Sequence, residues 1–209
     1  MSRLDRVLGL IDAANSADPN RIAVDGDLLP AELVYGLRMS ARLAALRPGA
    51  SEHLRIAARA QHLERWTLPR ASYPMDRPGY LRWRNEQKRR HAARISELMT
   101  EAGYDPADCA RVAGLVQKRD LRSDPEAQTL EDVACLVFIE HYLAGFAAGR
   151  DPAHLADIVA KTWRKMSEEG HAAALPLAGR LPPGLREIVT DGVRIASGAP
   201  DAIPPLPPG

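Results

Sequence analysis

The sequence has little of what marks a disulfide-rich, zinc-finger or membrane protein. Its 209 residues include two cysteines, Cys109 and Cys135, which lie far apart and have no CxxC pattern or Cys/His cluster beside them. This excludes a disulfide framework and the usual zinc-finger spacing. No stretch reaches the roughly eighteen apolar residues of a membrane span, and the first twenty residues have no cleavable signal pattern. We therefore expect a soluble, cytoplasmic protein without a membrane partner.

A large excess of charge of one sign is also missing. The formal net charge is +1, whereas proteins that bind polyanions over a whole domain usually carry a clear basic excess. Any electropositive function must therefore be local. The motifs GxSxG and GxxxxGK[ST] are absent, which excludes a serine nucleophile elbow and a P-loop of those patterns.

Long alternation of apolar and polar residues is missing as well, whereas alanine, leucine, arginine and glutamate are abundant. This composition favours helices, and we predict an all-α fold: a single multi-helix domain over residues 1–198, followed by a proline-rich flexible tail over 199–209. Asp-Pro pairs at Asp105, Asp124 and Asp151 are typical of helix starts. The expected helices are 3–16, 30–46, 51–66, 77–102, 106–118, 125–148, 152–167, 170–178 and 183–197.

The segment LEDVACLVFIEHYLAGF, residues 130–146, is apolar around almost its whole circumference. A helix of this kind passes through the middle of a domain. Asp132 on it cannot be buried unpaired without a large desolvation cost, so it needs an arginine, a histidine, a hydrogen-bond network or a metal. Glu131 and Glu140 are expected to reach the surface more easily.

Basic and aromatic residues gather between residues 53 and 94. Eleven lysines and arginines stand there against three acids, and Trp66, Tyr73, Tyr80 and Trp83 are interleaved among them. Guanidinium groups attract phosphate or carboxylate, and aromatic faces stack on a base or an arginine. The alternative is a solvated arginine face over a core that the tryptophans anchor. The loop TLPRASYPMD, residues 67–76, is expected to be ordered but irregular, at the rim of a crevice.

His62 and His91 are expected on the two helices that flank this loop, with both imidazoles facing one crevice. Together with Asp132, these side chains would suit a single divalent transition metal, zinc, manganese or iron, with open positions for water or phosphate. The structural alternative is that each histidine is a hydrogen-bonded group at a helix edge.

Most of the chain resembles an uncharacterised bacterial family known as domain of unknown function 4202. The segments that carry the resemblance cover roughly residues 8–177 and include LIDAANSADP, PAELVYGLRM, AARAQHLERW, SYPMDRPGYLRWR, SDPEAQTLEDVACLVFIEHY and KTWRKMSEEGHAAAL. The resemblance implies no activity.

A remoter resemblance is to the HD superfamily of helical metal-dependent phosphohydrolases. AARAQHLERW is similar to the helix that carries the His-Asp pair of that superfamily, and PEAQTLEDVACL is similar to its late aspartate segment. The chain departs from the pattern at Leu63, where the aspartate of the pair is expected, and at Ala92 and Lys118. What remains compatible with the resemblance is a one-metal site or an inactive scaffold with an HD-like arrangement of helices.

Two functions follow as hypotheses. In the first, the chain hydrolyses a nucleotide or another small phosphorylated compound: His62, His91 and Asp132 hold the cation and act in catalysis, and charged and aromatic side chains hold the phosphate and its carrier. These ligand-binding residues are Arg59, Arg65, Tyr80, Trp83, Arg84 and Lys118. In the second, the chain is a binding module that recognises a nucleotide, RNA or an acidic partner through the same surface.

Overall fold

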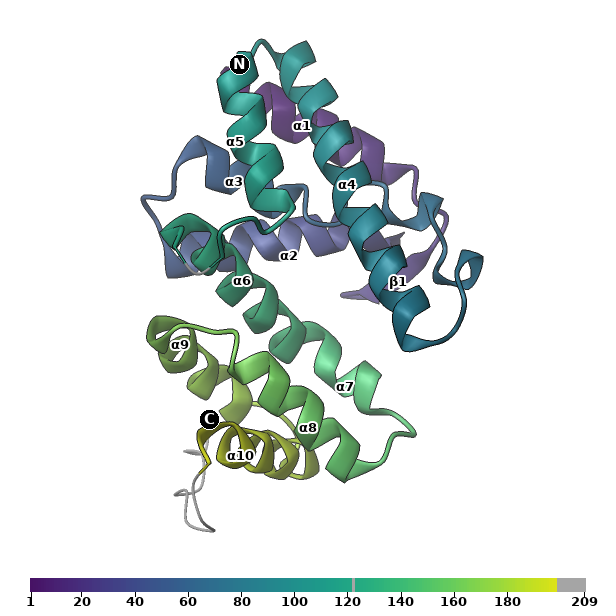
Figure 1. Cartoon of the computed structure of the whole chain (residues 1–209), viewed down its shortest axis with the longest axis vertical. Coiled ribbons are helices and arrows are strands. Elements are labelled where there is room, and N and C mark those ends of the chain that lie inside the picture. Colours follow the sequence, from purple (N-terminus) through teal and green to yellow (C-terminus); the bar gives the residue numbers. More distant parts are fainter. Residues whose placement is uncertain (122, 199–209) are drawn as a thin grey trace. The chain divides into compact units, whose positions relative to one another are not determined.

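A computed structural model describes residues 1–121 and 123–198, and it confirms the all-α fold (Figure 1). The chain forms two compact units, Met1–Leu130 and Glu131–Gly209. The predicted single domain over residues 1–198 stays a prediction. The predicted tail over 199–209 lies outside the described residues.

The first unit contains five complete helices, the start of a sixth, a hairpin and two short 3-10 turns in its described part. Its elements, in chain order, are α1 Arg3–Ser16, β1 Arg21–Val24, β2 Asp27–Pro30, α2 Ala31–Leu46, α3 Glu52–Arg59, η1 Arg65–Thr67, η2 Arg70–Ser72, α4 Arg77–Ala102 and α5 Pro106–Val116. Helix α4 packs against α1 and α5, and α3 packs against α2 and α5. The core between them contains the fully buried side chains Ile11, Met39, Ile56, Ile95 and Leu115.

Aspartate caps define several helix starts, as the Asp-Pro pairs predict. Asp105 accepts from the Asp108 amide at the start of α5, and Asp124 accepts from the Glu126 amide at the start of α6, Pro125–Val137. Helix α2 starts after Pro30, whose side chain has no hydrogen-bond acceptor for the free helix amides. The buried Asp18 replaces the cap, because its Oδ2 atom accepts from the Glu32 amide at 2.9 Å. Bonds of this type satisfy helix amides that have no partner within the helix.

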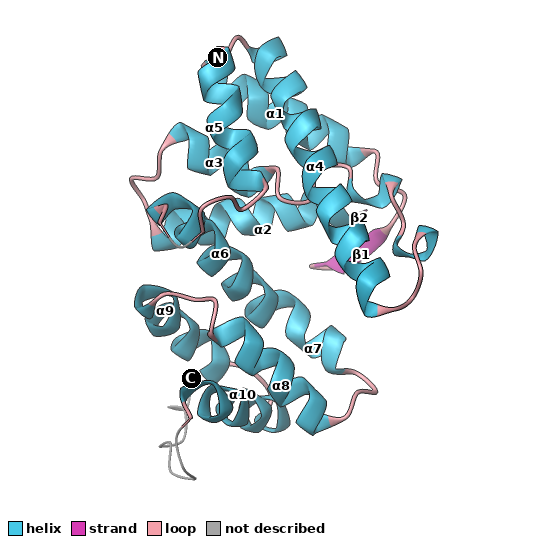
Figure 2. Ribbon diagram, viewed as in Figure 1, coloured by secondary structure: helices cyan, strands magenta, loops and turns pink. Residues whose placement is uncertain are grey.

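The antiparallel hairpin β1–β2 was not predicted (Figure 2). Its turn consists of Asp25 and Gly26, both with positive φ, 52° and 95°. An Asp-Gly pair in this conformation is the preferred two-residue hairpin turn, since glycine adopts positive φ without a steric cost.

The second unit is also helical where it is described. The chain continues from α6 through a π-helical turn, η3 Phe138–Tyr142, into α7 Leu143–Ala147, and three helices follow: α8 Pro152–Trp163, α9 Glu168–Gly179 and α10 Pro183–Ser197. Helices α8 and α10 pack closely, because Gly192 allows Val159 to approach the α10 backbone. The core includes Leu143, Val159, Ala178 and Val189.

Candidate functional site

His62 lies in a turn of the first unit and not on a helix, which corrects the prediction of a helix over 51–66. Helix α3 ends at Arg59, and Glu64 has a left-handed backbone with φ 52°. The Glu64 amide donates to Oδ1 of Asn15 at 2.9 Å, and Nδ2 of Asn15 donates to the Glu32 carbonyl at 3.3 Å. Asn15 is 1% exposed. It therefore fastens the turn that carries His62 to the first turn of α2.

Glu32 on α2 is the polar partner of His62. The Nδ1 atom of His62 lies 3.0 Å from Glu32 Oε2, and when Glu32 is ionised its carboxylate accepts from the Nδ1–H group. Tyr35, one turn further along α2, stacks on the imidazole with a centroid separation of 3.7 Å and an interplanar angle of 7°. These two contacts fix the plane of the ring and leave Nε2 as the atom with a free lone pair.

Burial keeps the side chains of His62 and Glu32 both uncharged just below pH 7. The pKa of His62 is well below its ordinary value, chiefly because of burial and also because of the positive charges of Arg65 and Lys118. Burial raises the pKa of Glu32 to about 7; Arg65 opposes this rise and Asp18 adds to it. The imidazole of His62 is therefore a neutral nitrogen donor near pH 7.

His91 on α4 lies beside His62, as predicted, with ring centroids 6.4 Å apart. The side chain is buried, and one ring N–H donates to the Gln61 carbonyl. The other ring nitrogen, Nε2, is buried and has no hydrogen-bond partner among the described residues. Burial, followed by the charges of His62 and Arg65, lowers the pKa of His91 to about 3. His91 is thus neutral, and its buried lone pair is unsatisfied.

The loop after His62 is ordered and is fastened to α4 one turn before His91. The indole N–H of Trp83 donates to the Leu68 carbonyl at 2.9 Å, and Nε2 of Gln87 donates to the carbonyls of Arg65 and Leu68. The Arg65 guanidinium lies 4.6 Å from the centroid of the Trp83 ring, and its Nε atom lies 3.9 Å from Glu32 Oε1. Arg65 therefore adds positive charge next to the histidine pair.

The other predicted ligand-binding residues have different surroundings. Trp83 is 7% exposed, so little of its surface remains to stack on a ligand, whereas Tyr80 is exposed and the Arg70 guanidinium lies 5.9 Å from its ring centroid. Arg84 is half-buried on α4. Lys118 follows α5 with a left-handed φ of 56° and contributes to the electrostatics of His62.

Arg59 lies against α1, where its Nε atom is 3.5 Å from Asp12 Oδ1. It is not among the charges that shift the pKa of either histidine. Its part in phosphate binding stays a prediction.

Asp132 belongs to the second unit. It is 3% exposed, and its carboxylate accepts hydrogen bonds from the Ser167 amide at 2.8 Å and the Ser167 hydroxyl at 2.6 Å. The hydrogen-bond network that burial of this charge requires is therefore present, and the predicted role as a metal ligand stays a prediction. Glu131, expected near the surface, is also buried, and its Oε1 atom lies 3.9 Å from Nζ of Lys165. That expectation was wrong.

Sequence reasoning missed Glu32, Tyr35 and Asn15. PAELVYGLRM was noted only as a family segment, and no local pattern indicates that Glu32 meets a histidine thirty residues later. Asn15 lies in LIDAANSADP at the end of α1, where an asparagine is ordinarily a helix-terminal residue.

The donor set fits a metal ion in part. Two neutral imidazoles with free Nε2 atoms, one held by a carboxyl group, correspond to the usual histidine–carboxylate arrangement around metals. With Zn–N bonds of about 2.0–2.1 Å and tetrahedral geometry, two rings on one ion have centroids roughly 5 Å apart, so the observed 6.4 Å requires the rings to approach by about 1 Å to share an ion. Within residues 1–121 and 123–198, however, no group of three or more His, Cys, Asp or Glu side chains is placed to hold an ion.

A family model described as domain of unknown function (DUF4202) matches residues 5–189 of the chain. No curated protein and no solved structure matches it. None of the described helices combines the length and apolar character that crossing a membrane requires.

Proposed function

The chain belongs to the DUF4202 family, to which no reaction is attached, and we propose that it is a divergent metal-dependent phosphohydrolase. Its substrate would be a nucleotide or another small phosphorylated compound. The observation that carries this proposal is the buried, unpartnered Nε2 atom of His91 next to His62. A buried polar atom without a partner costs about 1–3 kcal/mol, so it is expected where a ligand supplies the missing partner.

In this proposal, His62 and His91 hold a divalent zinc, manganese or iron ion through their Nε2 atoms. The ion would lower the pKa of a bound water and so supply a nucleophile near neutral pH. When ionised, Glu32 keeps the proton of His62 on Nδ1, which leaves the Nε2 lone pair for the ion. Arg65 and Lys118 contribute positive charge that favours a phosphate group beside the pair. An HD-like arrangement of helices remains part of the proposal, while the metal-ligand role of Asp132 stays a prediction from the sequence.

The alternative is a binding module without chemistry, and one observation favours it. Because the described residues provide two nitrogen donors and no third ligating side chain next to them, the pair is also suited to accept hydrogen bonds from a bound ligand. Such a module would take a nucleotide or an acidic partner. RNA is a weaker candidate, because Trp83 is largely buried. A cytoplasmic setting is part of both proposals.

The experiment that separates the two is a phosphate-release screen with untagged protein. Nucleoside mono-, di- and triphosphates and p-nitrophenyl phosphate are offered with zinc, manganese or iron(II), to the wild type and to His62→Ala and His91→Ala. His53→Ala is the matched control, because His53 is a histidine of the same unit that pairs with Asp108 at 2.6 Å.

We expect turnover that falls at least about 100-fold in the first two variants and is unchanged in the control. Turnover that survives both substitutions contradicts the proposed site. Binding of a nucleotide without turnover, at an affinity that decreases with salt, supports the binding module.

A further inference from the structure

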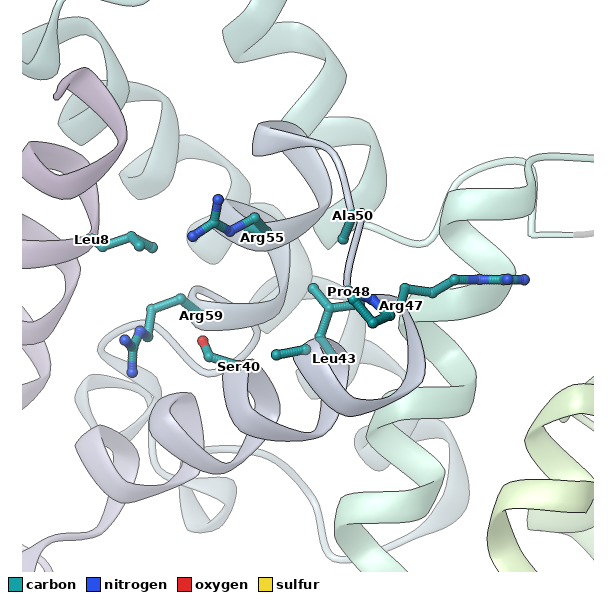
Figure 3. Close-up of a pocket in the computed structure, with 9 residues that line it drawn as sticks. Leu8, Ser40, Leu43, Arg47, Pro48, Ala50, Arg55 and Arg59 are labelled. Atoms are coloured by element: carbon teal, nitrogen blue, oxygen red, sulfur yellow. The ribbon is translucent and has the colours of Figure 1, made fainter.

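A pocket of about 290 Å³ opens between α1, α2 and α3 in the first unit, away from the histidine pair (Figure 3). Leu8 and Leu43 give it apolar walls, and Ser40, Arg55 and Arg59 give it polar ones. None of the described partners of His62 or His91 lines it. The volume is at the lower end for a small-molecule site, where a single ring with a charged group fits.

Arg59 is the most buried of the three arginines at this pocket. Its side chain is 13% exposed, and its Nε and Nη1 atoms are buried without hydrogen-bond partners among the described residues. The nearest acid is Asp12, whose Oδ1 atom lies 3.5 Å from Nε and also lacks a hydrogen bond. A buried guanidinium with unpaired N–H groups is costly. An anion in the pocket would supply the missing acceptors.

Arg55 lies one helical turn before Arg59, so both side chains leave the same side of α3. Figure 3 shows the two guanidinium groups extending from α3 in the direction of α1, with the Ser40 oxygen directed into the same space. The Arg55 guanidinium forms no hydrogen bond or ion pair within the part of the chain that the structure describes. Arg47, the third arginine at the pocket, extends away from it (Figure 3).

We propose that this pocket binds a small organic anion, a carboxylate or phosphate group attached to a short apolar body. Arg59 and Arg55 hold the charged group in charge-assisted hydrogen bonds, and Ser40 donates a third. Leu8 and Leu43 cover the apolar body. The site is separate from the histidine pair, so it stands whether or not the chain is a hydrolase.

The test is calorimetric titration of the full chain with four probes: inorganic phosphate, phenyl phosphate, benzoate and benzyl alcohol. Arg59→Gln removes the charge inside the pocket, and Arg6→Gln is the control, because Arg6 is an exposed arginine on α1 that does not line it. Ala44→Leu narrows the pocket at an exposed lining position without changing any charge.

We expect phenyl phosphate, benzoate or both to bind the wild type. The affinity should be at least about tenfold lower for Arg59→Gln and for Ala44→Leu, and within about twofold of the wild-type value for Arg6→Gln. Binding of one aromatic anion alone identifies the charged group as phosphate or carboxylate. Inorganic phosphate should bind more weakly than phenyl phosphate, since it has no apolar body.

Three results overturn the proposal: no binding of either aromatic anion, equal binding of benzyl alcohol, or an equal loss in Arg6→Gln. If Arg59→Gln does not fold, Ala44→Leu decides, because binding that survives narrowing of the pocket takes place elsewhere.

Discussion

The ring of His91 lies 6.4 Å from that of His62, centroid to centroid, and its Nε2 atom is buried without a hydrogen-bond partner among the described residues. The neighbouring imidazole has a defined orientation, since Glu32 binds its Nδ1 atom and Tyr35 stacks on its face. Two neutral nitrogen donors thus meet in a setting that Arg65 and Lys118 make positive. Those positive charges favour an anionic group such as phosphate beside the pair, which the proposed function requires.

Glu32→Gln should change how stability depends on pH. The folded-state pKa of Glu32 is raised by burial from 4.5 to about 7, so the folded protein holds a proton that the unfolded chain has already lost. Wild-type stability therefore falls as pH rises from 4.5 to 7, and the penalty is fully present above pH 7. The variant has no such penalty, and near pH 8 it should be more stable than the wild type by about 1–3 kcal/mol.

Urea denaturation at several pH values, with a chelator in every sample, measures the difference between the two proteins. The difference should grow from pH 4.5 to 7 and then level off. A difference that is constant over that range would show that Glu32 titrates normally in the folded protein.

Asn15→Ala should destabilise the first unit and loosen the turn that carries His62. The substitution leaves the Glu64 amide and the Glu32 carbonyl without their partner. Loss of both bonds should cost about 2–4 kcal/mol. Asn85→Ala, at an exposed site on α4, is the control and should be nearly neutral. Chemical denaturation measures both, and equal stability of the two variants would argue against the bridging role of Asn15.

Gly170→Ala tests the setting of Asp132 in the second unit. A Cβ atom at this position would lie 2.7 Å from Asp132 Oδ1, so the carboxylate must move away from Ser167. We expect a loss of about 1–3 kcal/mol. Gly145→Ala on α7, where a Cβ meets nothing within 4 Å, should instead gain about 0.5–1 kcal/mol. Thermal unfolding distinguishes them, and a stabilising Gly170→Ala would contradict the close contact.

Helix ends were predictable where a capping residue or an N-terminal proline agrees with a periodic apolar pattern. The ranges 3–16, 77–102 and 183–197 coincide with α1, α4 and α10, and Asp76 caps α4 as a side-chain acceptor should. The helix predicted over 51–66 ends at Arg59, and beyond it the Glu64 amide donates to Asn15, a residue distant in sequence. The π-helical turn at Phe138–Tyr142 contains no proline or glycine that would indicate an interruption of the helix.

The candidate site was predictable only in part. The proximity of His62 and His91 followed from the two segments that flank one loop, and the need of Asp132 for partners followed from its apolar surroundings. Glu32 could not be predicted as the partner of His62, because a hydrogen bond across thirty residues leaves no mark in the local pattern. The hairpin that precedes Glu32 has a sequence signal for its turn, the pair Asp25-Gly26. Its two strands are too short to show a clear alternation of apolar and polar residues, so the hairpin was not predicted.

The measurement that tests the central claim most directly is elemental analysis of untagged protein purified without chelators, with His62→Ala, His91→Ala and His53→Ala beside the wild type. We predict about one zinc, manganese or iron ion per chain in the wild type and in His53→Ala, and none in the other two variants. Wild-type protein that contains no metal, and takes up none when dialysed against these ions, would contradict the metal-dependent site. Metal retained in His91→Ala would contradict it equally.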